Sequence, residues 1–166
     1  NNQEIAWKSC DTLYFECENN ILKKPIIGLI ADENSLINNI FYHTSIATSN
    51  KNKKALLSVT VVKSHPLSEE NLIKTVQNEL EKFCGIKHTT FIKRYEIKKA
   101  LPKLSNLEYK LSHTETQLNS SVFLAGDVLL NGSLNAAMIA GEKAAIGVIK
   151  TLEDGLIVEE LTSEYQ

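Results

Sequence analysis

The first 63 residues carry hydrophobic and polar positions in the alternating order of β-strands. In residues 9–17, Leu13, Phe15 and Cys17 fall on one face of a strand, while the residues between them are mostly polar. Further strands are predicted at residues 25–31, 37–44 and 55–63. Polar, turn-forming clusters separate these segments, so the pattern favours a sheet whose strands follow one another closely.

The pattern then changes from the period of a strand to that of a helix. Ser68 can cap the free N–H groups of a helix start, and the two acids after it complement the helix dipole. Apolar residues follow at helical spacing, and Gly85 provides a helix end. The predicted core-facing stripe consists of Leu72, Val76, Leu80 and Phe83. Residues 89–97 predict one more strand, and Pro102 ends the segment that follows it.

Residues 122–145 combine an apolar strand, a carboxylate, a turn and a helix of small residues. Residues 122–125 are apolar, as expected of a strand covered on both faces. Gly126 allows a close approach of the backbone, and Asp127 comes just beyond the strand, where open α/β sheets bind ligands. A carboxylate at this point can accept hydrogen bonds from sugar hydroxyls. An aspartate there can equally cap a helix or stabilise a turn.

The turn at residues 131–133 opens the helix. Its first N–H groups lack intrahelical partners, so the helix start favours an anion or a carbonyl that becomes anionic. Alanine and glycine line the helix, and Gly141 costs about 1 kcal/mol relative to alanine. We therefore expect a close approach to another element at Gly141.

In residues 124–137 the sequence resembles the carboxyl-terminal flavin motif of the FAD-dependent amine oxidase and phytoene desaturase superfamily. The resemblance rests on Leu124-Ala-Gly-Asp127 and on Gly132-Ser-Leu-Asn-Ala-Ala137, in this order and spacing. It implies that Asp127 contacts the ribityl or pyrophosphate part of FAD and that the backbone of residues 133–136 lies against the flavin ring. The family's Ser-Gly later in this helix is Ala140-Gly141 here. The implied cofactor-binding residues are Gly126, Asp127, Gly132, Ser133, Leu134, Asn135 and Ala136.

A weaker resemblance to the same superfamily extends over residues 7–150. Five segments look like its substrate-domain strands: residues 12–16, 25–30, 36–40, 56–60 and 100–102. The resemblance implies substrate binding by Tyr95, Ala100, Leu101 and Pro102. As bare residues, the same four are also typical of strand packing and strand termination.

Together these patterns predict an α+β fold in three parts. Residues 1–118 would form part of a substrate-binding domain, with a mixed or antiparallel sheet and a covering helix. Residues 119–152 would supply the last strand and helix of an FAD-binding Rossmann-like domain, and residues 153–166 an acidic tail. The seven glycines form no G-x-G-x-x-G turn, and the chain does not begin with methionine. The sequence therefore predicts a carboxyl-terminal piece whose partner is a missing amino-terminal FAD-binding half.

Two functions follow from this interpretation. The resemblance implies an FAD-dependent oxidoreductase that transfers hydride from a C–N or C–C bond of a small-molecule substrate to flavin N5, with catalytic residues and substrate unidentified. The isolated chain would be inactive. The alternative is a non-catalytic binding or interaction module, because the chain holds only half of an FAD site. Apolar surface left uncovered by the missing half would then favour self-association.

Composition excludes several other classes. With 18 basic and 20 acidic residues, the net charge is −2, which argues against partners such as nucleic acid or anionic membranes. Apolar stretches are too short to span a bilayer, which favours a soluble piece. The location of a longer parent stays unknown from composition, with the cytoplasm as the expected default. Three cysteines without a C-x-x-C pair favour reduced structural thiols: Cys10, Cys17 and Cys84. Four scattered histidines predict no metal site: His43, His65, His88 and His113.

Overall fold

The computed structural model of the chain describes residues 5–46 and 54–154, which form two compact units. The sheet unit comprises residues 8–100, and the helix unit comprises the described residues of 1–7 and 101–166. The sequence placed its change of domain between residues 118 and 119 instead. That boundary concerns the parts of a longer protein and stays a prediction. Most of the predicted acidic tail lies outside the described residues.

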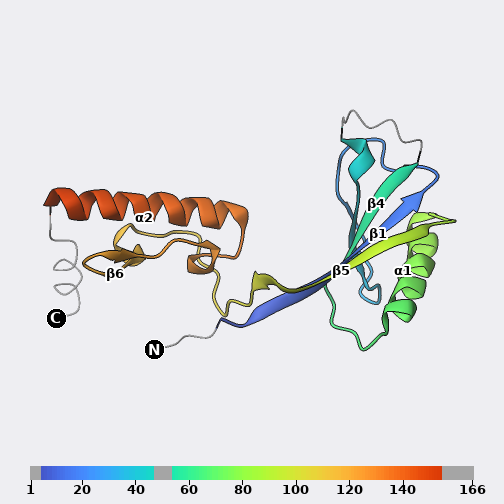
Figure 1. Ribbon diagram of the computed structural model, residues 1–166, viewed down its shortest axis with the longest axis horizontal. Coiled ribbons are helices and arrows are strands. Elements are labelled where there is room, and N and C mark those ends of the chain that lie inside the picture. The colour runs from blue at the N-terminus through green and yellow to red at the C-terminus, as the bar shows by residue number, and fades with distance from the viewer. Residues whose placement is uncertain (1–4, 47–53, 155–166) are drawn as a thin grey trace. The chain divides into compact units, whose positions relative to one another are not determined.

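A five-stranded sheet dominates the sheet unit (Figure 1). Its strands are β1 (Trp7–Cys17), β2 (Gly28–Leu29), β3 (Ile37–Tyr42), β4 (Ala55–Val61) and β5 (Thr90–Pro102). They lie in the order β2-β3-β4-β1-β5, and β2 with β3, β3 with β4, and β4 with β1 pair antiparallel. The chain thus has an α+β fold with an antiparallel sheet, as the sequence predicted.

Alternation along β1 and β4 builds the core. Leu13 pairs with Val59 and Phe15 with Leu57, and all four side chains are fully buried. The strand predicted at residues 25–31 is much shorter, because only Gly28–Leu29 pairs with β3. β3 also ends earlier than predicted, and the 3-10 turn η1 (His43–Ser45) follows it.

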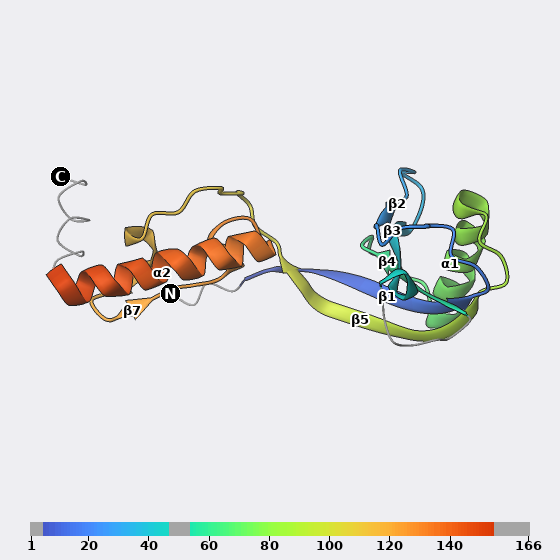
Figure 2. The ribbon, with the colours of Figure 1, turned by 90° about the horizontal axis from the view of Figure 1, so that it is seen from above.

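Helix α1 (Glu69–Cys84) covers one face of this sheet (Figure 2). The Asn71 N–H donates to Ser68 Oγ at 3.4 Å, and Gly85 ends the helix with φ 66°. The helix side chains that are fully buried on the sheet are Leu72, Val76 and Leu80. The cap, the helix end and these three positions were predicted from the sequence. Phe83, the fourth predicted member of the stripe, is only half-buried and lies outside the core, with Lys82 Nζ 4.6 Å from its ring centroid.

The helix unit contains α2 (Leu134–Asp154) and several short elements. These are η2 (Thr114–Thr116), β6 (Gln117–Asn119), β7 (Val122–Phe123) and η3 (Asp127–Leu129). The predicted four-residue strand covered on both faces is wrong: β7 has two residues and pairs antiparallel with β6, and Val122 remains 43% exposed. In the described residues no parallel strand lies beside it, so the apolar residues 122–125 have nothing to bury both faces.

The buried face of α2 is made of small residues, but the close approach is not at Gly141. Buried positions of the helix are Ala136, Ala140, Ala144 and Gly147. A Cβ at Gly147 would lie 2.9 Å from Phe123 Cε1 and 3.1 Å from the His113 carbonyl oxygen. A Cβ at Gly141 would meet nothing within 4 Å among the described residues, because this position faces away from β7.

This difference predicts opposite effects for two matched substitutions. Gly147→Ala should lower the free energy of unfolding by about 1–2 kcal/mol, because the methyl group overpacks against Phe123 and a fixed carbonyl. Gly141→Ala should raise it by up to about 1 kcal/mol through helix propensity. Urea unfolding of both variants at one protein concentration measures this difference. Equal effects at the two positions would contradict the packing described here.

Candidate functional site

Gly126 and Asp127 begin the candidate cofactor site. Gly126 has φ 150° and ψ 161°, a backbone conformation that is open almost only to glycine. The Asp127 carbonyl oxygen accepts hydrogen bonds from the N–H groups of Leu130 at 3.2 Å and Gly132 at 3.0 Å, so the main chain holds the turn. The half-buried Asp127 carboxylate makes no hydrogen bond or ion pair within residues 5–46 and 54–154. Its oxygens are not used as a cap there and are available as acceptors.

The structure brings a predicted substrate residue beside a predicted cofactor residue. Gly132 has φ 67°, and a Cβ on it would lie 3.2 Å from Cγ of Pro102, which is buried at the end of β5. Asn131 Nδ2 donates to the Glu108 carbonyl oxygen at 3.1 Å. This hydrogen bond connects the segment after β5 to the same turn. Leu101 is exposed beside Pro102 in the helix unit, whereas Ala100 belongs to the sheet unit.

Ser133 forms the start of α2. Its hydroxyl donates to Asn131 Oδ1 at 2.7 Å and accepts the Ala136 N–H at 3.1 Å. One of the free N–H groups predicted at this helix start is therefore satisfied by the chain itself. Leu134 and Asn135 are exposed, and the first turn of α2 contains no acid. The positive end of the helix dipole is thus not neutralised by a carboxylate of its own first turn.

Tyr95, the remaining predicted substrate residue, lies in the sheet unit on the sheet face opposite α1. Its ring contacts Tyr14 edge-on, with centroids 5.8 Å apart. Tyr14 in turn lies 5.6 Å from the His43 ring, which meets Phe41 at 5.1 Å. We call Tyr14, Phe41, His43 and Tyr95 the aromatic face. Tyr95 is 49% exposed, so the face presents ring surface to solvent.

The strand register explains the aromatic face. Tyr14 on β1 and Phe41 on β3 both pair with Ser58 of β4, so all three side chains lie on one face. The Ser58 hydroxyl donates to the Phe41 carbonyl oxygen at 3.3 Å and lies 3.0 Å from His43 Nε2, which fixes the imidazole. Sequence reasoning missed Tyr14, Phe41 and His43. The available signal was an aromatic residue on the otherwise polar face of the strand at residues 9–17.

The three thiols occupy environments that disfavour the thiolate. Burial raises the pKa of Cys17 to about 11, and burial also raises the pKa of Cys10 and Cys84. All three cysteines are free. A raised pKa reduces the thiolate fraction at neutral pH, so these side chains are poor nucleophiles.

Within the described ranges, no three His, Cys, Asp or Glu side chains gather closely enough to hold a metal ion. Among the same residues, no helix combines the length and apolar character needed to cross a membrane.

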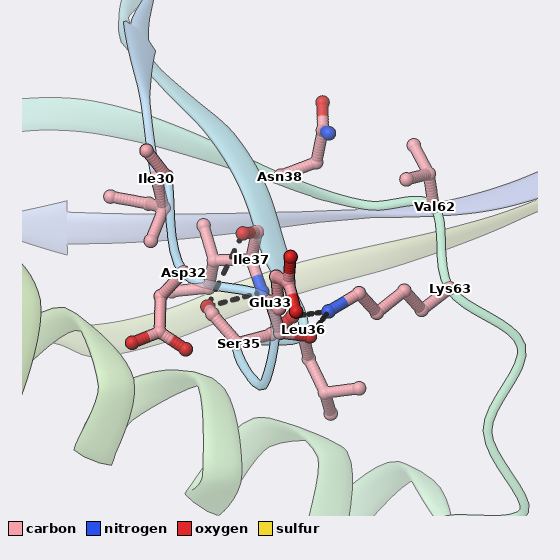
Figure 3. A pocket seen from close by; sticks show the side chains of 10 residues that line it. Ile30, Asp32, Glu33, Ser35, Leu36, Ile37, Asn38, Val62 and Lys63 are labelled. Carbon is pink, nitrogen blue, oxygen red and sulfur yellow. Dashed lines mark hydrogen bonds between the residues drawn. The ribbon is translucent and has the colours of Figure 1, made fainter.

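An open groove of about 470 Å³ lies at the turn between β2 and β3 (Figure 3). It is lined by Ile30, Ala31, Asp32, Glu33, Ser35, Leu36, Ile37, Asn38, Val62 and Lys63. Lys63 Nζ donates to the carbonyl oxygens of Glu33 and Ser35, in the latter case at 2.6 Å. None of the predicted site residues lines this groove, and its lysine already holds the turn.

No protein-family model and no curated protein sequence matches the chain. Solved structures do match. The fold is similar to that of an oxidoreductase from Methanosarcina mazei, with a TM-score of 0.55 and 12% identity over 86% of this chain and 34% of that chain. It is also similar to a protein from Exiguobacterium sp. 255-15 that carries the provisional name protoporphyrinogen oxidase, with a TM-score of 0.58 and 19% identity over 91% of this chain and 36% of that chain.

The chain thus spans about a third of the length of these proteins. At such low identities the similarity concerns the fold alone. This chain has the α+β fold of one part of larger proteins named as oxidoreductases.

Proposed function

We propose that the chain is the carboxyl-terminal part of an FAD-dependent, amine oxidase-like oxidoreductase. The observation that carries the proposal is the Asp127 carboxylate, which follows the glycine-only conformation of Gly126 and has no partner among the described residues. It lies in a fold shared with larger oxidoreductases. The partner we propose is an amino-terminal half that carries the pyrophosphate-binding glycine turn absent from this sequence.

The residues present fit part of a flavin dinucleotide. The Asp127 carboxylate would accept hydrogen bonds from ribityl hydroxyls, and Gly126 has no Cβ to obstruct them. The start of α2, with no acid in its first turn, would favour a flavin carbonyl that gains negative charge. When bound, FAD would supply the acceptor for hydride from a C–N or C–C bond.

Substrate binding is proposed for two groups of residues. In the helix unit, Pro102 lies beside Gly132 and so adjoins the proposed flavin contacts, and the exposed Leu101 precedes it in the chain. In the sheet unit, Tyr95 and the rest of the aromatic face would offer apolar ring surface to a small-molecule substrate.

Flavin retention tests the proposal. We expect the longer natural protein to purify with flavin absorbance bands and the 166-residue chain to lack them. In the longer protein, Asp127→Ala should weaken FAD binding about 10- to 100-fold, the worth of one or two hydrogen bonds to a charged acceptor. Glu153→Ala, which removes an exposed acid of α2, is the matched control and should retain flavin.

Two results would overturn the proposal. A longer protein without flavin would leave Asp127 as a residue of the turn and favour a non-catalytic interaction module. Full flavin occupancy in Asp127→Ala would remove this residue from the cofactor site.

A further inference from the structure

Helix α2 has an exposed face that carries a continuous apolar row. The row consists of Leu134, Met138, Gly141, Ala145, Val148 and Leu152. Its large members are well exposed: Leu134 by 78%, Met138 by 67% and Leu152 by 81%. In Figure 1 the other elements of the helix unit lie along one side of α2 only. Helical spacing places the row on the opposite side of the helix from the buried Ala136, Ala140 and Ala144.

The spacing of this row is that of a helix-pairing seam. Its members are separated alternately by four and three residues, which is the 3.5-residue repeat of a coiled coil. A surface helix that meets only water would place polar residues here. The row therefore marks a face that pairs with another helix.

The order of side chains in the row reads almost the same in both directions. Leucines stand at its two ends, Met138 and Val148 come next, and the small residues Gly141 and Ala145 stand at its centre. We propose that the 166-residue chain forms a two-fold symmetric dimer in which two copies of α2 pair antiparallel along this row. Leu134 then packs on Leu152 of the second copy, and Met138 on Val148 of the second copy.

The centre of the row allows this pairing at short range. A Cβ on Gly141 meets nothing within 4 Å, and Ala145 is exposed, so the two helices can approach to about 8 Å where they cross. Together with the adjacent Ile149, the row exposes roughly 600 Å² per copy. A pair therefore buries about 1,200 Å², the lower limit of stable specific interfaces.

A charged side chain flanks the centre of the row. Glu142 lies beside its centre, so antiparallel pairing brings the two Glu142 carboxylates near the two-fold axis. This repulsion makes a specific prediction, because Glu142→Gln should strengthen the dimer about 2- to 5-fold. A dimer formed through any other surface would not respond to this substitution.

The inference does not depend on the proposed function, since it concerns the 166-residue chain and is measured without flavin. Light scattering and sedimentation should show a dimer for the natural sequence. Ala145→Glu should weaken it roughly 100-fold by placing a charge in the seam. Lys150→Gln changes the net charge equally but lies on the polar side of α2, so it should leave the dimer intact.

Disulfide trapping tests the antiparallel register. The double substitution Met138→Cys with Val148→Cys should give intermolecular disulfides, whereas Met138→Cys alone should behave like the natural chain. A monomer across a wide concentration range would overturn the proposal. The row would then be a surface that contacts another part of a longer protein. Equal trapping of the single and double variants, or a dimer that survives Ala145→Glu, would overturn it as well.

Discussion

Replacing Asp11 by alanine is expected to lower the free energy of unfolding of the sheet unit by about 3–5 kcal/mol. Asp11 on β1 is more than nine-tenths buried, and its Oδ1 accepts a hydrogen bond from Arg94 Nε at 2.7 Å. Its Oδ2 lies 3.1 Å from Nε2 of the buried His65. The hydrogen bond that Arg94 donates to Asp11 raises the pKa of Arg94. A guanidinium is charged at any ordinary pH, so in Asp11→Ala it would remain charged and largely buried, with only the exposed Glu69 carboxylate within 3.8 Å.

A second substitution separates the ion pair from simple packing. The double variant Asp11→Ala with Arg94→Met should be markedly more stable than Asp11→Ala alone, because no uncompensated charge remains. Glu69→Gln should cost less than about 1 kcal/mol, since Glu69 is exposed and lies 3.8 Å from Arg94 Nη1. Urea unfolding of these variants and of Arg94→Met alone completes the double-mutant cycle. Additive effects of the Asp11 and Arg94 substitutions would rule out the proposed coupling.

Sequence patterns could not predict this cluster. Asp11 is separated by 54 positions from His65 and by 83 from Arg94, and local periodicity carries no information over such distances. The strand at residues 9–17 could be predicted because each of its side chains alternates relative to its neighbours. The helix at 69–84 could be predicted because its cap, stripe and terminating glycine are all local signals.

In the candidate cofactor site, too, features set by local sequence could be predicted and features set by distant contacts could not. The turn at residues 131–133 and the helix after it follow from turn and capping chemistry and were predicted. The length of β7 depends on which strands lie beside it, so apolar composition alone gave a strand that is too long. Likewise, the small residues of α2 indicate that another element packs closely against the helix. The position of the Phe123 ring determines that this close contact occurs at Gly147.

The aromatic face depends on strand register and on the order of strands in the sheet. Its residues come from β1, the end of β3, η1 and β5, and the pairing of Tyr14 and Phe41 with the same serine brings both of their rings against His43. A register shifted by one residue would turn Tyr14 into the core and expose Leu13. Tyr95 could be singled out by resemblance alone, whereas its contacts required the sheet order in which β5 lies beside β1.

Removing the carboxylate of Glu79 should lower the free energy of unfolding of the sheet unit by about 2–3 kcal/mol. Glu79 on α1 accepts hydrogen bonds from the Leu36 N–H at 2.9 Å, the Ile37 N–H at 3.1 Å and the buried Ser35 hydroxyl at 2.7 Å. One carboxylate thus accepts hydrogen bonds from the N–H groups at the start of β3 and connects the turn before this strand to the covering helix. Glu79→Ala leaves the Leu36 N–H without its acceptor, whereas the Ile37 N–H keeps Ser35 Oγ at 3.0 Å and the Ser35 hydroxyl keeps the Ile37 carbonyl oxygen at 3.3 Å.

Amide hydrogen exchange distinguishes this role from a general loss of stability. In Glu79→Ala, the Leu36 amide should exchange faster than the drop in global stability explains, and the Ile37 amide less so, because it also donates to Ser35 Oγ. Glu79→Gln should retain part of this protection through its carbonyl oxygen. Lys63→Met is the matched control, because Lys63 holds the same turn through carbonyl oxygens and leaves the Glu79 contacts in place. If Lys63→Met accelerated exchange of the Leu36 and Ile37 amides as strongly as Glu79→Ala, the turn would be held by Lys63, just after β4. Helix α1 would then contribute only its apolar face.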